Sequence, residues 1–154
     1  MQTHLQQCES TVVMPMKIFK TYTELSALPT FEDRFAYVQT FSKVGEDSFG
    51  SKRYLNQVLY KSKEWKKVRD DVILRDNGCD LGIEGREIAG HIHVHHINPI
   101  TAEQILNRDP AIFDMDNLIC CSEITHKALH YGDISSTVSD YKERTPNDTT
   151  PWKN

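Results

Sequence analysis

The stretch His91-Ile-His-Val-His-His-Ile97 decides the fold, together with a second stretch that begins at Asn117 and carries His126 and His130. Six of the seven histidines of the chain lie between residues 91 and 130. In the first stretch histidine alternates with isoleucine and valine, which is typical of a strand, and Asn98-Pro99 ends it. Histidines concentrated in this way predict that several of them meet in one functional site, because unrelated histidines scatter over a protein surface.

The spacing of the histidines suggests separate roles for them. Neighbouring side chains of a strand point to opposite faces, so His95 and His96 cannot both join one tight ligand set on an undistorted strand. His126 and His130 are four residues apart and share one face of a helix. One strand histidine and two helix histidines give three protein ligands with open positions, the pattern of a catalytic metal site. The imidazole left free lies close by and suits a general base, and the Asn117 amide can hold that imidazole or the loop carrying it.

Two alternatives concern the other histidines and the helix pair. His91 and His93 share a strand face with His95, and the sequence leaves open whether they lie near the metal or only line the strand. Two histidines four residues apart on a helix, like His126 and His130, also occur in zinc proteases. Those enzymes place Glu directly after the first histidine, where this chain has Lys127, so a protease is disfavoured.

The pattern along the chain predicts a mixed α+β protein in which helices precede a ββα block. We expect residues 1–15 to be disordered, 16–76 to form an N-terminal helical region, 77–132 to form the ββα core, and 133–154 to be an extended or disordered tail. Capping residues and apolar stripes mark the helices. The expected helices run from Thr21 or Thr23 to Leu28, from Thr30 to about Lys43, from about Ser51 to Tyr60, from Ser62 to about Asp76, from Thr101 to about Asn107, and from Ser122 to about His130. The expected strands are a hairpin or strand pair over Glu87–Ile97 and a short strand over Asn117–Cys121.

Length and composition indicate one soluble domain. A chain of 154 residues buries enough surface to fold without disulfides. No apolar run approaches the roughly 20 residues of a membrane span, and the first residues lack the pattern of a signal peptide. We therefore expect an intracellular protein without membrane association. The four cysteines contain no CxxC pair, and we expect reduced, largely buried thiols at Cys8, Cys79, Cys120 and Cys121.

The charge of the chain is unevenly distributed. The net charge of −4 argues against a globally basic nucleic-acid binder. Residues 52–75, however, carry eight basic residues against Glu64, Asp70 and Asp71, a local excess of five. Such a segment suits a phosphate-binding face, and a solvated helix face is the alternative. The candidate nucleic-acid-binding residues are Lys63, Lys66, Lys67 and Arg75.

Three motifs together resemble a known family. His95-His-Ile97, then Asn117-Leu118, then His126 and His130 resemble the HNH endonucleases, whose core is the ββα-metal fold. The spacing is similar to the three-histidine variant found in colicin-type nucleases. The resemblance covers about residues 75–132, and its surrounding phrases are similar to small HNH proteins of bacteriophages and prophages, which often lie beside DNA-packaging genes.

The resemblance implies a metal-dependent mechanism of DNA cleavage. It places one divalent metal ion on His95, His126 and His130, with His96 as the base that deprotonates the attacking water and Asn117 orienting His96. The products would carry 5′-phosphate and 3′-hydroxyl ends. The basic helices would position the DNA backbone, and no segment resembles a base-reading element, so phosphate contacts, DNA shape or a partner would direct cleavage.

Departures from the family pattern refine this expectation. Many members form a structural zinc ribbon from two CxxC pairs, but this chain has Cys79 with Gly82 and Ser122 with Thr125 at those places, so we expect no structural zinc. Many members also have Asp where this chain has His95. Three imidazoles favour Zn, Ni, Co or Mn, and Mg stays an alternative.

The resemblance also bears on partners and cellular context. It implies a phage-encoded protein in the cytoplasm of a bacterial host, acting on DNA and linked to genome packaging, with terminase subunits as candidate partners. The alternative is a packaging accessory or scaffold protein with weak intrinsic nuclease activity that acts through terminase.

Overall fold

The computed structural model describes residues 18–39 and 51–132, and the predictions made for residues 1–15, 40–50 and 133–154 lie outside this part. Within it, helices surround one two-stranded antiparallel sheet, which confirms the α+β class. The helices are α1 (Tyr22–Ser26), α2 (Phe31–Val38), α3 (Ser51–Lys61), α4 (Lys63–Arg75), α5 (Ala102–Leu106) and α6 (Glu123–Tyr131). The strands are β1 (His93–His96) and β2 (Leu118–Cys121), and single 3-10 turns cover Asp80–Gly82, Pro110–Ile112 and Met115–Asn117.

Hydroxyl side chains begin most of the described helices, as the sequence predicted. In each case the hydroxyl oxygen accepts a hydrogen bond from the backbone N–H three residues later, which satisfies one of the unpaired N–H groups of the first turn. These caps are Thr21 for α1, Thr30 for α2, Ser62 for α4, Thr101 for α5 and Ser122 for α6. Gly132 closes α6 in the left-handed region at φ 79°, a conformation that favours glycine.

Two expected elements differ from the structure. Helix α2 ends at Val38 rather than near Lys43, because Gln39 leaves the helical region with ψ 122°. The stretch Glu87–Ile97 forms no hairpin: only β1 is a strand, and its partner is β2. The first part of the stretch pairs elsewhere, since the Ile88 N–H donates to the Gly78 carbonyl and Glu87 bridges Cys79.

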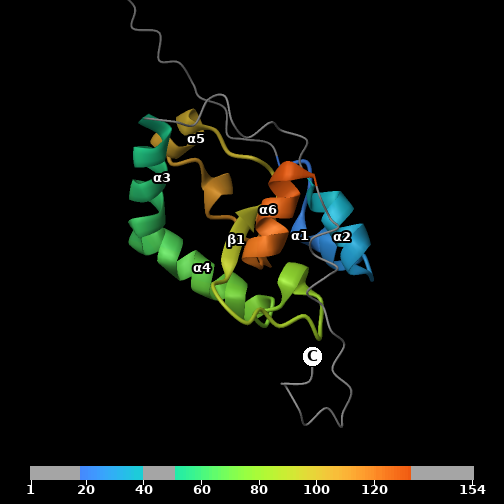
Figure 1. Cartoon of the computed structure of the whole chain (residues 1–154). Coiled ribbons are helices and arrows are strands. Elements are labelled where there is room, and N and C mark those ends of the chain that lie inside the picture. The colour runs from blue at the N-terminus through green and yellow to red at the C-terminus, as the bar shows by residue number, and fades with distance from the viewer. Residues whose placement is uncertain (1–17, 40–50, 133–154) are drawn as a thin grey trace, which may run out of the picture.

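The sheet lies between two helices, as Figure 1 shows for β1 between α4 and α6. The strands pair so that His95 lies opposite Ile119 and His96 opposite Leu118. Strand alternation then gives each face its own core. The residues on the α4 side are Val94, His96, Leu118 and Cys120, packed with Trp65, Val68 and Val72. The residues on the α6 side are His93, His95, Ile119 and Cys121, and Leu25, Phe31, Phe35 and Val38 of α1 and α2 join Ala128 and Leu129 in the same core.

The end of α4 fixes the outer edge of β2. The Arg75 guanidinium donates to the carbonyl oxygens of Met115 at 2.6 Å and Leu118 at 2.7 Å, and it pairs with Asp76 at 2.8 Å. Asp76 in turn accepts a hydrogen bond from the Cys120 N–H at 2.9 Å. These contacts satisfy backbone groups that a two-stranded sheet leaves unpaired on its open side.

The three described cysteines lie in the core, as the sequence suggested. Cys79, Cys120 and Cys121 are buried free thiols, and burial raises the pKa of Cys120 and Cys121. Cys8 lies outside the described residues. In the described ranges no helix combines the length and the apolarity that crossing a bilayer requires.

Candidate metal centre

Three histidines from two elements converge on the α6 side of the sheet. His95 comes from β1, and His126 and His130 come from successive turns of α6. Their candidate ligand atoms all lie within 4.8 Å of one another. The ring centroids of His95 lie 5.3 Å from those of His126 and 5.1 Å from those of His130. The structure thus brings together the three residues that the sequence assigned to the metal.

The hydrogen bonds of these rings leave nitrogen atoms available for a metal ion. Nε2 of His126 and Nε2 of His130 face each other at 3.1 Å. Nε2 of His95 and Nδ1 of His130 are buried and have no hydrogen-bond partner among residues 18–39 and 51–132. A buried polar atom without a partner is costly and calls for an explanation, and an ion bound by these imidazoles would provide one. Three imidazoles suit Zn, Ni, Co or Mn, so the residues present fit such an ion.

The protonation of the three rings also favours metal binding. Burial holds the pKa of His95 well below its ordinary value of 6.5 and lowers the pKa of His130. Burial, and then the neighbouring His130, lower the pKa of His126 to about 4. All three imidazoles are therefore neutral at pH 7, the form that binds metal ions.

His96 occupies a different environment on the opposite face. Its ring stacks on Trp65, with 5.3 Å between ring centroids and 27° between ring planes. Its Nε2 lies 3.0 Å from the Ile112 carbonyl oxygen, which can only accept, so Nε2 carries the proton and Nδ1 the lone pair. Burial lowers the His96 pKa to about 4 against the opposing effect of this hydrogen bond. His96 is therefore a neutral imidazole at pH 7, oriented by the hydrogen bond from its Nε2–H and with a free lone pair on Nδ1.

Asn117 orients the loop beside His96 rather than the imidazole itself. Its fully buried side chain accepts hydrogen bonds from the backbone N–H of Asn98 at 2.9 Å and from the Asn98 amide at 2.7 Å. It donates to the Ala111 carbonyl oxygen at 3.0 Å. Ala111 precedes Ile112, whose carbonyl holds His96, so Asn117 acts on His96 through the 111–112 backbone. The hydrogen bonds to Asn98 also hold the segment that directly follows His96, which corresponds to the loop alternative of the two that the sequence left open.

The four candidate nucleic-acid-binding residues fall into two groups. Lys63, Lys66 and Lys67 are exposed on α4, and Lys67 forms a surface ion pair with Asp71 at 3.1 Å. The Arg75 side chain is only 18% exposed, and its guanidinium makes the hydrogen bonds to the edge of β2 described above. Arg75 therefore serves the fold, in contrast to the three exposed lysines.

His91 and His93 extend the cluster. The His93 ring stacks on the His126 ring with 4.8 Å between centroids and 8° between planes. His91 is exposed, and its ring packs edge-on to that of His93 at 4.7 Å. The sequence placed His93 on the correct strand face, whereas His91 lies before the start of β1. The contact between His93 and His126 was not predictable, because it depends on how the helix docks.

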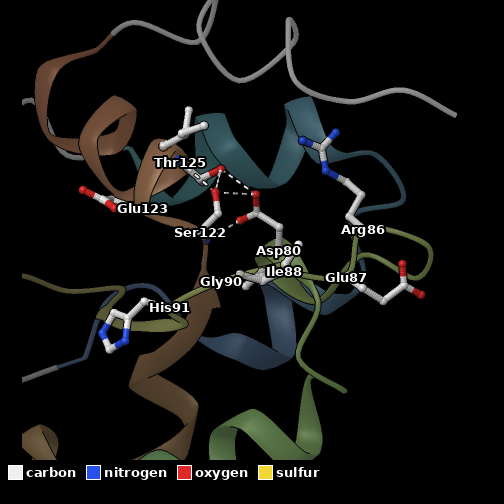
Figure 2. Close-up of a pocket in the computed structure, with 11 residues that line it drawn as sticks. Asp80, Arg86, Glu87, Ile88, Gly90, His91, Ser122, Glu123 and Thr125 are labelled. Carbon is white, nitrogen blue, oxygen red and sulfur yellow. Dashed lines mark hydrogen bonds between the residues drawn. The ribbon is translucent and has the colours of Figure 1, made fainter. Parts of the chain in front are cut away.

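Asp80 is a structural residue that the sequence did not reveal. It lies at the wall of a pocket of about 380 Å³ beside the histidine cluster, between the 86–91 segment and the start of α6 (Figure 2). The buried carboxylate accepts hydrogen bonds from the Ser122 N–H at 3.1 Å, the Ser122 hydroxyl at 3.0 Å and the Thr125 hydroxyl at 2.6 Å. Ser122 and Thr125 stand at places where the resembling family often has cysteines, and here they bind a carboxylate.

Comparison with known proteins adds no relative. No family model, curated protein or solved structure matches the chain. The function is therefore inferred from the residues of the chain and their arrangement.

Proposed function

We propose that this protein is a metal-dependent endonuclease of the HNH type that hydrolyses phosphodiester bonds in DNA. The observation that carries the proposal is the convergence of His95, His126 and His130 from one strand and one helix. The order β1, β2, α6, with the histidines on the first strand and the helix, supports a ββα-metal core. The chemistry expected of such a core is hydrolysis that leaves 5′-phosphate and 3′-hydroxyl ends.

The three histidines would hold one divalent metal ion, with Zn, Ni, Co and Mn favoured by the donor set. When bound, the ion supplies Lewis-acid stabilisation of the negative charge that develops on the phosphate group. The chain prepares for it by keeping three neutral imidazoles close together in a partly buried cluster.

His96 is the proposed general base. Its Nδ1 lone pair takes a proton from the attacking water while the Ile112 carbonyl keeps Nε2–H in place. Oxygen of that water bonds to phosphorus, the bond from phosphorus to the 3′ oxygen breaks, and solvent protonates the 3′ oxygen. A nearby phosphate anion favours the charged imidazolium and so raises the pKa of His96 from its value of about 4 towards neutrality.

Exposed lysines on α4 are the proposed contacts to the DNA backbone. Lys63, Lys66 and Lys67 face solvent, and they lie on the helix that packs against the His96 side of the sheet. Contacts of this kind bind phosphates irrespective of base sequence. We therefore expect cleavage that depends on salt concentration and DNA shape more than on sequence.

The test is nicking of supercoiled plasmid by the full chain during titration with Mn²⁺, Co²⁺, Ni²⁺, Zn²⁺ or Mg²⁺. His96→Ala should lose at least about 100-fold in cleavage rate, as expected for a lost general base, while binding metal as the native chain does. His130→Ala should lose both metal affinity and cleavage. His91→Ala is the matched control and should cleave normally, since His91 is exposed and outside the three-histidine group. Native cleavage by His96→Ala would contradict the base assignment, and metal-independent cleavage would contradict the proposal as a whole.

An apolar groove favours a second candidate, a packaging accessory protein with weak intrinsic cleavage that acts through terminase. The groove, of about 230 Å³, lies between α3 and α5 and is lined by Leu55, Val58, Leu59, Ile105, Leu106 and Phe113. Val58 is 52% exposed and Leu106 is 66% exposed, so a protein partner can reach them. This candidate predicts that a terminase subunit stimulates cleavage strongly, and that Val58→Ser with Leu106→Ser removes the stimulation but not the basal rate. Full activity of the isolated chain would count against it.

A further inference from the structure

We infer that His93 is a positioning residue that holds the ring of His126 in its orientation for metal binding, an inference that rests on the proposed metal site. The two rings lie face to face, 4.8 Å apart and within 8° of parallel. His93 comes from β1, two residues before His95, and alternation places both side chains on the α6 side of the sheet. The strand therefore places His93 beside His126 and contributes His95 to the three-histidine group.

His126 gains from such a contact because its ring lacks a second hydrogen bond within the described residues, although it also meets the rings of His95 and His130 edge-on. Metal-binding histidines usually donate their second ring N–H to a carboxylate or a carbonyl, which sets the ring plane. Among residues 18–39 and 51–132, the hydrogen bond of the His126 ring runs to His130 alone, through Nε2, the nitrogen that faces the cluster. The terminal torsion of a histidine is broad, so a ring without a second hydrogen bond can rotate. Stacking against His93 restrains that rotation.

The geometry argues that His93 restrains a ligand and is not a ligand itself. The lone pair of an imidazole lies in the plane of its ring. Two parallel rings in face-to-face contact cannot direct their lone pairs at one point between them. His93 accordingly lies outside the group of histidines whose nitrogen atoms converge within 4.8 Å.

His91 completes the packing behind His93. Its ring meets the His93 ring edge-on, with 4.7 Å between centroids and 88° between planes, which is a favourable aromatic arrangement. His91 touches neither His95 nor α6 through any ring contact within the described ranges, so its removal should leave His126 in place. His91 is therefore the matched control for His93.

The experiment is titration of the metal-free full chain with Co²⁺, followed by the visible absorption of the bound ion. His93→Leu removes the aromatic face at similar volume, and His93→Phe keeps the face while removing both nitrogen atoms. We expect His93→Leu to weaken Co²⁺ binding by about 10- to 100-fold, the usual effect of losing an outer-shell contact. His93→Phe and His91→Ala should stay within about threefold of the native chain and keep its spectrum.

Other results of this titration would each contradict one statement about His93 or the metal site. Native affinity in His93→Leu would show that His93 does not position His126. An equal loss in His93→Phe and His93→Leu would show that a nitrogen of His93 is needed, and would replace the positioning role with a direct one. If the native chain binds Co²⁺ and shows these effects but does not cleave DNA, the nuclease proposal fails and the inference stands. If the native chain binds no Co²⁺, both fail.

Discussion

At the scale of single residues, the surroundings assign different tasks to residues of the same type. His95 and His96 are neighbours, yet one faces α6 and the candidate metal group while the other stacks on Trp65. The basic residues divide in the same way. Lys66 is exposed, whereas Arg75 uses its guanidinium on backbone carbonyls at the edge of β2. Charge alone therefore does not identify a DNA contact.

This division predicts that two variants in α4 affect different properties, one DNA binding and the other stability. Lys66→Ala with Lys67→Ala should weaken DNA binding and reduce its salt dependence by about one to two released counterions, with little change in stability. Arg75→Met should lower the free energy of unfolding by about 2–4 kcal/mol, because it leaves the partly buried carbonyls of Met115 and Leu118 without donors. Urea unfolding and fluorescence anisotropy with a short duplex at several salt concentrations measure both. A stably folded Arg75→Met protein with lost DNA affinity would return Arg75 to the DNA-binding set.

At the scale of elements, side chains that are distant in sequence fix where α6 and the sheet lie. Asp80 joins the segment after α4 to the first turn of α6, since its carboxylate accepts three hydrogen bonds from Ser122 and Thr125. Ser122 is also the N-cap of α6. His126, the first histidine of the helix, follows directly after Thr125, so this network sets the start of the helix that carries two candidate ligands.

Removal of the Asp80 carboxylate should loosen the start of α6. We expect Asp80→Ala to lower the free energy of unfolding by about 2–3 kcal/mol, since buried hydroxyl and amide donors lose their acceptor. Amide hydrogen exchange at Thr125 and His126 should accelerate more than exchange in α4. Glu87→Ala, an exposed residue on the wall of the same pocket, is the control and should change neither measurement. If exchange in Asp80→Ala accelerates equally in α4 and α6 relative to the native chain, Asp80 does not act locally.

The elements also show which features were predictable from the sequence. Helix starts at Thr30, Ser62 and Ser122 were predictable because a cap depends only on neighbouring residues. The opposite facing of His95 and His96 followed from strand alternation. The stretch Glu87–Ile97 was misjudged because Ile88 pairs with Gly78 in a loop, a choice that local composition does not encode.

The side-chain partners of the candidate site depended on tertiary contacts. Spacing was enough to group His126 and His130 with a strand histidine. The tasks of Arg75, Asp80 and His93 arise only when α4 and α6 dock on the sheet, so no local pattern announces them.

At the scale of the whole molecule, a small sheet packed between helices keeps His95 and His96 away from solvent. His95 and His96 are each 8% exposed, on opposite faces of β1. Their burial depends on both cores together, the one under α4 and the one shared by α6, α1 and α2. Neutral imidazoles are favoured there, and this couples the stability of the fold to pH.

The metal-free protein should therefore lose stability in weak acid. The pKa of His96 and of His126 is lowered from 6.5 to about 4 in the fold, so unfolding releases imidazoles that take up protons. The stability that depends on keeping these imidazoles neutral is fully present above pH 6.5 and is lost as the pH falls towards 4. For His96 this loss amounts to up to about 3 kcal/mol in the free energy of unfolding. Urea unfolding across this range measures it. His96→Phe, which can keep the stacking on Trp65, should show a shallower pH dependence. A free energy of unfolding that stays constant from neutral pH to about pH 4.5 would contradict this coupling.

The proposed function depends on one divalent metal ion held by His95, His126 and His130. The most direct test is a crystal structure of the zinc-loaded protein, with anomalous diffraction measured at the zinc edge. We expect one strong peak about 2.0–2.1 Å from a nitrogen atom of each of the three imidazoles. A peak bound elsewhere, at no more than one of these three histidines, or no peak at all, would contradict it.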